Sequence, residues 1–294
     1  MSGPTQIFDR ALLDRRRARA LRLGPADFLL RRTADDLCDR LIAVKRRFPI
    51  AVEIGSPLPF LAERLQASGQ VGQIFRMDRV ATDADLIGGE ELLPFRAESL
   101  DLVVSALVLQ FTGDLPGAFV QIRRALKPDG LFLATFLGGE TLTELRASFA
   151  AAESELAGGA SPRVAPFAEL RAVGGLLQRA GFALPVIDQD RLVVRYADPI
   201  GLMRDLRAMG ASNALVERTR RPLRRSVLMR AAEIYGERFA DVDGRIRATF
   251  DVISVSGWAP HEGQQKPLRP GSAKARLADA LGTVERSAGE KAGR

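Results

Sequence analysis

An alternation of short apolar runs with helix-like segments constrains this chain more than any other feature. The apolar runs resemble strands buried on both faces of a parallel sheet, and they lie at residues 50–54, 72–78, 100–111 and 131–137. Helix patterns follow two of them, at 60–69 and 114–130. Because parallel strands need right-handed crossover connections, this order predicts an α/β fold with a doubly wound, mostly parallel sheet.

Segments on both sides of this alternation extend the predicted fold. Two amphipathic helices are expected first, at 8–24 and 26–47. Beyond residue 138 we expect helices at 140–156, 199–210 and 225–239 and strands at 184–196 and 247–258. A helical insertion at about 199–245 thus precedes the last strand. We divide the chain into an N-terminal helical segment (1–47), a central domain (48–263) and a basic, flexible tail (264–294).

The counts of histidine and cysteine exclude several kinds of site. His261 and Cys38 are the only residues of their types. The chain therefore cannot build a zinc site from several His and Cys ligands, an iron site with two histidines, or an internal disulfide. We predict no metal site, and a single cysteine suits a reducing compartment.

The charge is uneven along the chain. The net charge is +7, but residues 51–263 carry 24 basic and 27 acidic side chains, so the excess lies at the two ends. A basic end is typical of a solvated helix face or a docking arm. No basic face interleaved with aromatic residues is present in the body of the chain, which argues against a nucleic-acid partner. No apolar run is long enough for a membrane span.

The N-terminal segment is rich in arginine, as mitochondrial presequences are. Presequences are poor in acidic residues, whereas this segment contains Asp9 and Asp14. We therefore expect the segment to be the first helix of a mature, cytoplasmic protein.

The loop after the first predicted strand, in "VEIGSPLPF", is where a doubly wound sheet binds ligands. Glu53, Gly55, Asp78 and the end of the 100–111 strand all fall at the carboxyl ends of strands. Gly55 suits a tight turn with positive φ. Pro57 and Pro59 follow it, and proline has a fixed φ and no N–H to donate to a ligand.

An ordered set of motifs is similar to class I S-adenosylmethionine-dependent methyltransferases, of the type 11-like group: "VEIG", "RMD", "LPF", "LDLVVS" and "LKPDGLFLATF". The resemblance implies a Rossmann-like, seven-stranded sheet. It also implies cofactor contacts from six residues. Glu53, Gly55 and Ser56 would serve the amino-acid end and Asp78 the ribose hydroxyls. Glu91, or Glu90 beside it, would serve the adenine, and Gln110 lies in the same predicted pocket.

Four longer segments narrow the resemblance and together cover nearly the whole chain: "IFDRALLDRRRARAL", "GGETLTELR", "MGASNA" and "GWAPHEGQQKP". They resemble the complex I assembly factor five family, whose animal member is described as an arginine hydroxylase acting on a subunit of NADH:ubiquinone oxidoreductase. The malonyl-carrier-protein methyltransferase is a more distant relative. Because "IFDR" begins at residue 7, we expect a bacterial member without a presequence.

Three departures from the family pattern lie in one predicted pocket. Prolines replace two loop glycines, Gly89 stands where an adenine-contacting aspartate is usual, and Gln110-Phe111 stand where His-Trp is usual. We expect S-adenosylmethionine to bind weakly or not at all. The principal hypothesis is therefore an assembly factor that contacts a complex I subunit. The alternatives are an active methyltransferase for a protein, carrier-protein or small-molecule acceptor, and an arginine-hydroxylase-like activity.

Two residues are candidates for catalysis if the protein is an enzyme. His261, in "GWAPHE", could transfer a proton or contact a partner, or it could be an ordinary surface imidazole. Glu140, in "GGETLTELR", follows the 131–137 strand on the ligand side, where it could shape the substrate entrance or belong to an ordinary helix face.

Overall fold

The computed structural model describes residues 6–265, 278–279 and 282–284. The chain divides into two compact units, Met1–Pro260 and His261–Arg294. All named helices and strands belong to the first unit. Apart from 264–265 and those few later residues, the predicted tail lies outside the described part of the chain.

The first unit is built on a seven-stranded sheet with the order β3-β2-β1-β4-β5-β7-β6. Neighbouring strands from β3 to β5 pair in parallel, and β7 runs antiparallel to both β5 and β6. The predicted fold, a mostly parallel seven-stranded sheet, is confirmed. The strands are β1 (Phe48–Ile54), β2 (Val71–Asp78), β3 (Leu86–Ile87), β4 (Leu100–Ala106), β5 (Leu126–Gly138), β6 (Ala183–Tyr196) and β7 (Ile246–Trp258).

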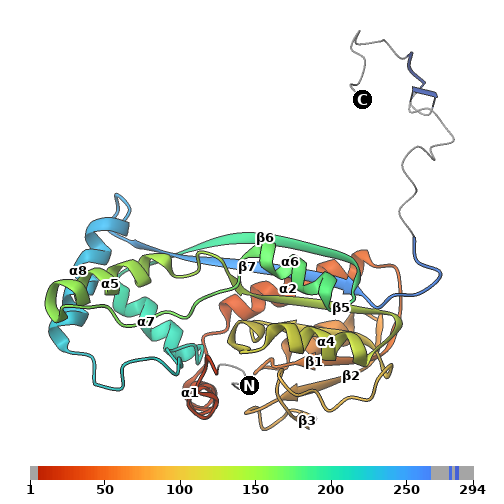
Figure 1. Ribbon diagram of the computed structural model, residues 1–294, viewed down its shortest axis with the longest axis horizontal. Coiled ribbons are helices and arrows are strands. Elements are labelled where there is room, and N and C mark those ends of the chain that lie inside the picture. Colours follow the sequence, from red (N-terminus) through yellow and green to blue (C-terminus); the bar gives the residue numbers. More distant parts are fainter. Residues whose placement is uncertain (1–5, 266–277, 280–281, 285–294) are drawn as a thin grey trace. The chain divides into compact units, whose positions relative to one another are not determined.

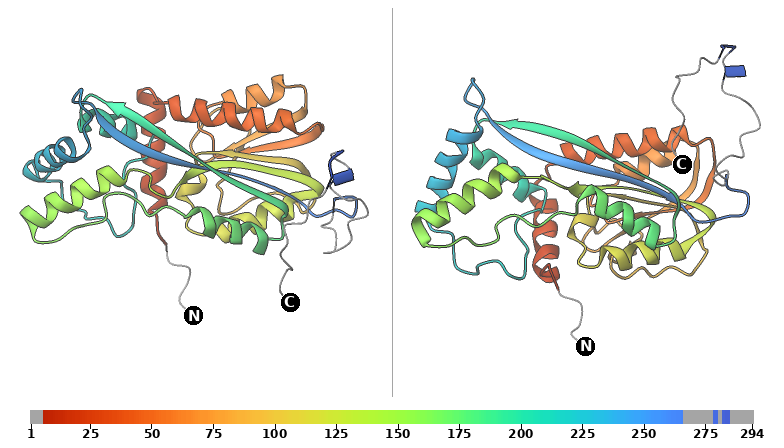
Figure 2. Two further views of the ribbon diagram at one scale, coloured as in Figure 1. Left: turned by 90° about the horizontal axis from the view of Figure 1, so that it is seen from above. Right: turned by 45° about the horizontal axis from the view of Figure 1, so that its top comes forward.

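Helices cover both faces of the sheet (Figures 1 and 2). One apolar core joins α2 and α3 to the sheet, and another joins α4 and α6 to its other face. These helices bury an apolar stripe, as the periodicity predicts. The helices are α1 (Arg10–Leu23), α2 (Phe28–Ala43), α3 (Phe60–Ala67), α4 (Leu115–Ala125), α5 (Thr143–Ala157), α6 (Leu170–Arg179), α7 (Pro199–Ala208) and α8 (Arg225–Phe239), with a short 3₁₀ turn η1 (Leu109–Phe111).

A third core joins the helices α5, α7 and α8 to β7. In Figure 1 these helices lie together at one end of the long β6–β7 pair. It contains Phe149 of α5, Leu202 of α7, Tyr235 of α8 and Phe250 of β7. The helices α7 and α8 stand between β6 and β7 in the sequence, so the predicted helical insertion before the last strand is present.

Two predicted boundaries are wrong, one at the end of β4 and one at the start of β5. The strand predicted over 100–111 ends at Ala106, because Leu107 takes φ +54° and the chain then turns through η1. The helix predicted over 114–130 ends at Ala125, and Leu126 already belongs to β5. The "KPDG" turn therefore lies inside β5, where Asp129 takes φ +63°. The two-residue strand β3 was not predicted.

No helix among the described residues is long and apolar enough to span a membrane.

Candidate cofactor cleft

Gly55 directly follows β1 and has a backbone conformation that only glycine accepts at this position. Its φ is +79°, and its N–H donates to the Met77 carbonyl at 2.7 Å. A Cβ atom at Gly55 would lie 2.5 Å from Cγ1 of Val108. The predicted tight turn is present, and the close approach of Val108 adds a second reason for glycine.

We expect Gly55→Ala to lower the free energy of unfolding by about 2–5 kcal/mol. A left-handed conformation costs an alanine about 1–2 kcal/mol, and overpacking against Val108 adds about 1–3 kcal/mol. Gly69→Ala is the matched control, because Gly69 has φ +72° but nothing within 4 Å of an added Cβ. Urea unfolding of both variants measures the difference. Equal losses in the two variants would show that the Val108 contact is unimportant.

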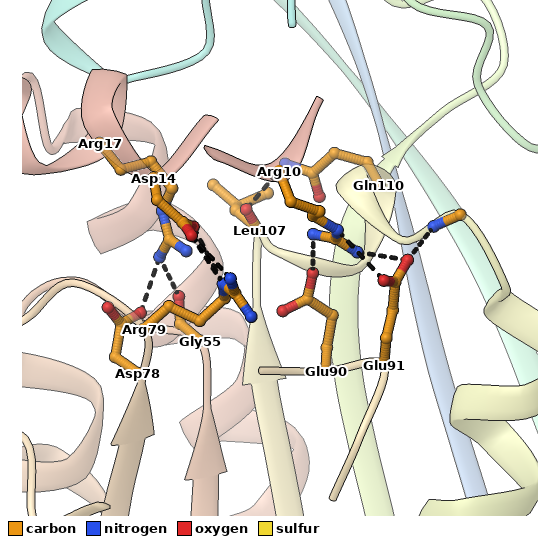
Figure 3. Close-up of polar contacts among 11 residues, drawn as sticks. Arg10, Asp14, Arg17, Gly55, Asp78, Arg79, Glu90, Glu91, Leu107 and Gln110 are labelled. Atoms are coloured by element: carbon orange, nitrogen blue, oxygen red, sulfur yellow. Dashed lines mark hydrogen bonds and ion pairs between the residues drawn. The ribbon is translucent and has the colours of Figure 1, made fainter. Parts of the chain in front are cut away.

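Asp78, the predicted ribose-binding acid, is fully engaged by the protein itself (Figure 3). It is buried at the end of β2, and its Oδ1 accepts from the N–H groups of Val80 and Ala81 at 2.7 and 2.8 Å. Its Oδ2 accepts from Arg17 Nη2 at 2.7 Å. The same Arg17 nitrogen donates to the Gly55 carbonyl at 2.8 Å. A cationic side chain from α1 therefore occupies the position where ribose hydroxyls would bind.

Three further ion pairs fix α1 against this edge of the sheet (Figure 3). Arg10 pairs with Glu90 and Glu91, and Asp14 accepts from Arg79 Nε and Nη2 at 2.9 and 2.7 Å. Residues four and three apart share one helix face, so Arg10, Asp14 and Arg17 all point the same way.

The helix α1 begins where the sequence offers a cap. Oδ1 of Asp9 accepts from the Leu12 N–H at 3.0 Å, and Asp9 also pairs with Arg218 at 2.9 Å. A capping aspartate satisfies an N–H that the helix leaves unpaired. The local sequence therefore sets the start of α1.

The acid predicted to contact adenine is engaged as well. Glu91 accepts from Arg10 and, at 2.6 Å, from the Gly113 N–H. Burial opposes ionisation of Glu91, but these hydrogen bonds outweigh it and lower the pKa of this carboxyl. Glu90, beside it, is buried against Arg10. Arg10 therefore holds both acids of this turn.

Ser56 and Gln110, the remaining predicted cofactor contacts, are also hydrogen-bonded within the protein. The Ser56 hydroxyl donates to the Leu58 carbonyl at 3.0 Å, and Gln110 Nε2 donates to the Leu107 carbonyl at 2.7 Å. Oε1 of Gln110 is buried with no hydrogen-bond partner among the described residues. Pro57 lines the same cavity as Gln110 and has no N–H to donate to a ligand.

The space beside Arg17 is small. A cavity of about 80 Å³ lies between Arg17, Pro57, Leu58 and Gln110. Small-molecule sites have roughly 300–1,000 Å³. With α1 in this position, the space beside Arg17 is too small for a nucleoside, although the acids that the resemblance assigns to the cofactor are present.

Glu53 is buried in β1 without a hydrogen bond. Neither carboxylate oxygen has a partner among the described residues, and Arg76 Nε lies 3.7 Å from Oε2. Burial raises the pKa of Glu53 to about 8, although the nearby Arg76 guanidinium acts in the opposite direction. A neutral carboxyl is therefore expected at this position near pH 7.

The two catalytic candidates are each described by their local contacts. The Glu140 side chain is exposed, and the backbone N–H of Glu140 donates to Oδ2 of Asp251 at 3.0 Å. His261 belongs to the second unit, where its Nδ1 accepts from the Gly263 N–H at 3.1 Å. Their proposed roles stay predictions. In the described part of the chain, no group of three or more His, Cys, Asp or Glu side chains is arranged to hold a metal ion.

Sequence reasoning missed the residues that close the cleft. The basic N-terminal helix was interpreted as a solvated face or docking arm, but Arg17 is only 7% exposed. Burial of one arginine within such a run depends on contacts distant in sequence, so periodicity alone cannot reveal it. Asp251, which holds the "GGETL" loop and pairs with Arg191 at 2.7 Å, was also missed. Its signal is a single acid inside the apolar strand "FDVISV".

Comparisons with known proteins first show the class of fold to which this chain belongs. Residues 63–134 match the family model described as a methyltransferase domain. The YcgJ protein of Bacillus subtilis has a similar fold, with a TM-score of 0.52 and 15% identity over 77% of this chain and 99% of that protein. The sheet order and these matches show a class I methyltransferase fold.

The relatives in sequence identify the family. The mitochondrial arginine-hydroxylase NDUFAF5 of Danio rerio is 37% identical over 287 residues, 93% of this chain and 89% of that protein. The chain belongs to this family, as the motifs predicted. The malonyl-[acyl-carrier protein] O-methyltransferase of Xylella fastidiosa is 35% identical over 221 residues, 74% of this chain and 70% of that protein.

Proposed function

We propose that this protein is an assembly factor for respiratory complex I and that it uses a methyltransferase fold as a binding scaffold. The observation that carries the proposal is the Arg17–Asp78 pair, which closes the ribose position from inside the protein. Family membership supplies the biological context, because the NDUFAF5 proteins are complex I assembly factors. The closed cleft supports a role that does not consume S-adenosylmethionine.

A second candidate is methyl transfer after α1 has moved away from the sheet. Its support is that Asp78 and Glu53 both remain, and that one group of relatives is named as O-methyltransferases. In this case, Arg17 would have to leave Asp78 before the cofactor could enter. The two candidates differ in whether the function of the protein requires S-adenosylmethionine.

Complementation in a bacterium that has complex I but lacks its own member of this family tests the first proposal. Expression of this protein should restore assembled complex I, measured by in-gel NADH oxidation. Purified protein should also capture a complex I subunit equally well with and without added S-adenosylmethionine. No restoration would reject the assembly role, and capture that requires the cofactor would favour the second candidate.

A further inference from the structure

A second cavity lies beside the closed cleft and is lined mainly by apolar side chains. Its volume is about 330 Å³, and its walls include Phe149 of α5 and Met203 and Leu206 of α7. It shares Phe111 and Leu137 with the small cavity of the cleft, so the two are neighbours. A site of this size accepts a bulky apolar group.

The polar side chains of this cavity are cationic or neutral. Arg16 and Arg163 are the charged residues in its lining, and no carboxylate is among them. Arg163 pairs with Glu153, and Arg16 donates to the Asn213 carbonyl. Both arginines are therefore held in place as parts of the wall, and the cavity offers nothing to neutralise a cationic ligand.

An arginine-rich loop borders the same cavity. Residues 216–225 contain five arginines and one acid, and Leu223 lines the cavity. Among the described contacts, Arg218 pairs with Asp9. The other four are exposed and make no ion pair with a described residue: Arg220, Arg221, Arg224 and Arg225. An apolar cavity thus has uncompensated positive charge at its edge.

We propose that this cavity and the arginine loop bind an acidic segment of a partner protein, with one bulky apolar side chain inserted into the cavity. The proposal deepens the assembly role and rests on it for the nature of the partner. Acidic side chains would pair with the exposed guanidinium groups, which steer association and fix orientation. The apolar side chain would supply the buried anchor that interfaces need at their centre.

The shape of the site favours a peptide segment over a membrane surface. A bilayer is contacted by a convex apolar face with basic flanks, whereas here the apolar residues line a cavity behind the loop. A single side chain can enter such a cavity while its neighbours remain at the rim. Charge at the rim and an apolar centre are the usual anatomy of a protein–protein interface.

Fluorescence anisotropy with the full-length protein tests the proposal. The probe is a labelled 15-residue peptide rich in aspartate and glutamate with one central leucine. Its controls are the same peptide with glycine in place of leucine, and vesicles of phosphatidylglycerol. The loop variant is Arg221→Glu/Arg224→Glu. The matched variant is Arg47→Glu/Arg96→Glu, which reverses two exposed arginines that precede β1 and β4.

We expect the leucine peptide to bind and the loop variant to weaken binding at least about tenfold. The Arg47→Glu/Arg96→Glu protein should bind as wild type does, and the glycine peptide should bind more weakly. Equal weakening by both variants, equal binding of both peptides, no peptide binding, or loop-dependent binding to vesicles alone would each overturn the proposal. This readout uses purified protein, so it succeeds or fails independently of complementation.

Discussion

Arg17→Ala is expected to lower the free energy of unfolding by about 3–5 kcal/mol, because it removes one partner of a buried ion pair. Asp78 is fully buried and Arg17 is 7% exposed, so water does not screen this pair as it would a surface pair. Asp78 would keep the Val80 and Ala81 N–H donors, which places the expected loss at the lower end of the range. Urea denaturation measures the change.

A double-mutant cycle separates the contribution of the Arg17–Asp78 pair to the free energy of unfolding from any general effect of the substitutions on α1. Arg17→Ala/Asp78→Ala should destabilise by less than the sum of the two single changes, with a coupling of about 2–3 kcal/mol. Arg19→Ala is the control, because Arg19 is exposed on the same helix and makes no described ion pair. That change should stay within about 0.5 kcal/mol of wild type. Additive single changes would mean that Arg17 does not act through Asp78.

Glu53→Gln is expected to remove a pH-dependent loss of stability. The pKa of Glu53 is about 8 in the folded protein, against 4.5 for an unperturbed carboxyl. Below pH 4.5 the carboxyl is protonated in both states and costs nothing. As pH rises from 4.5 to 8 the unfolded state ionises first, so stability falls by about 1.4 kcal/mol per pH unit. The full effect is on the order of 5 kcal/mol.

Unfolding measured at several pH values tests this prediction through the difference between variant and wild type. Glu53→Gln should become progressively more stable than wild type between pH 4.5 and 8, with no further gain above that range. Glu63→Gln is the control, because Glu63 is an exposed carboxylate on α3. It should follow wild type throughout. A Glu53→Gln difference that does not change with pH would mean that Glu53 is ionised in the folded protein.

The sequence predicts the architecture well because a parallel sheet leaves a simple pattern. Strands such as β1 and β5 are buried on both faces and therefore appear as continuous apolar runs. The helix α8 was predicted with the observed bounds, Arg225–Phe239. Where a boundary was wrong, the cause was a backbone feature of single residues. Leu107 takes a positive φ that ends β4, and this conformation is unusual for leucine.

The sequence predicts where Gly55 and Asp78 lie in the sheet but not which residues contact them. Gly55 and Asp78 lie at the carboxyl ends of strands, where the topology places them. Their partners could not be predicted, because Arg17 reaches them from a helix 38 and 61 residues away in sequence. The exposed face and the buried face of α1 both carry arginine, so residue type alone does not separate them.

The central claim is that α1 closes the cofactor cleft by placing Arg17 on Asp78. Calorimetric titration with S-adenosylmethionine tests it most directly, using wild type, Arg17→Ala and Pro57→Gly/Pro59→Gly, each first shown to be folded by circular dichroism. The closed cleft predicts no saturable binding to wild type and binding to Arg17→Ala, which frees Oδ2 of Asp78. The proline variant should bind no better than wild type while Arg17 remains. Submicromolar binding to wild type would contradict the claim.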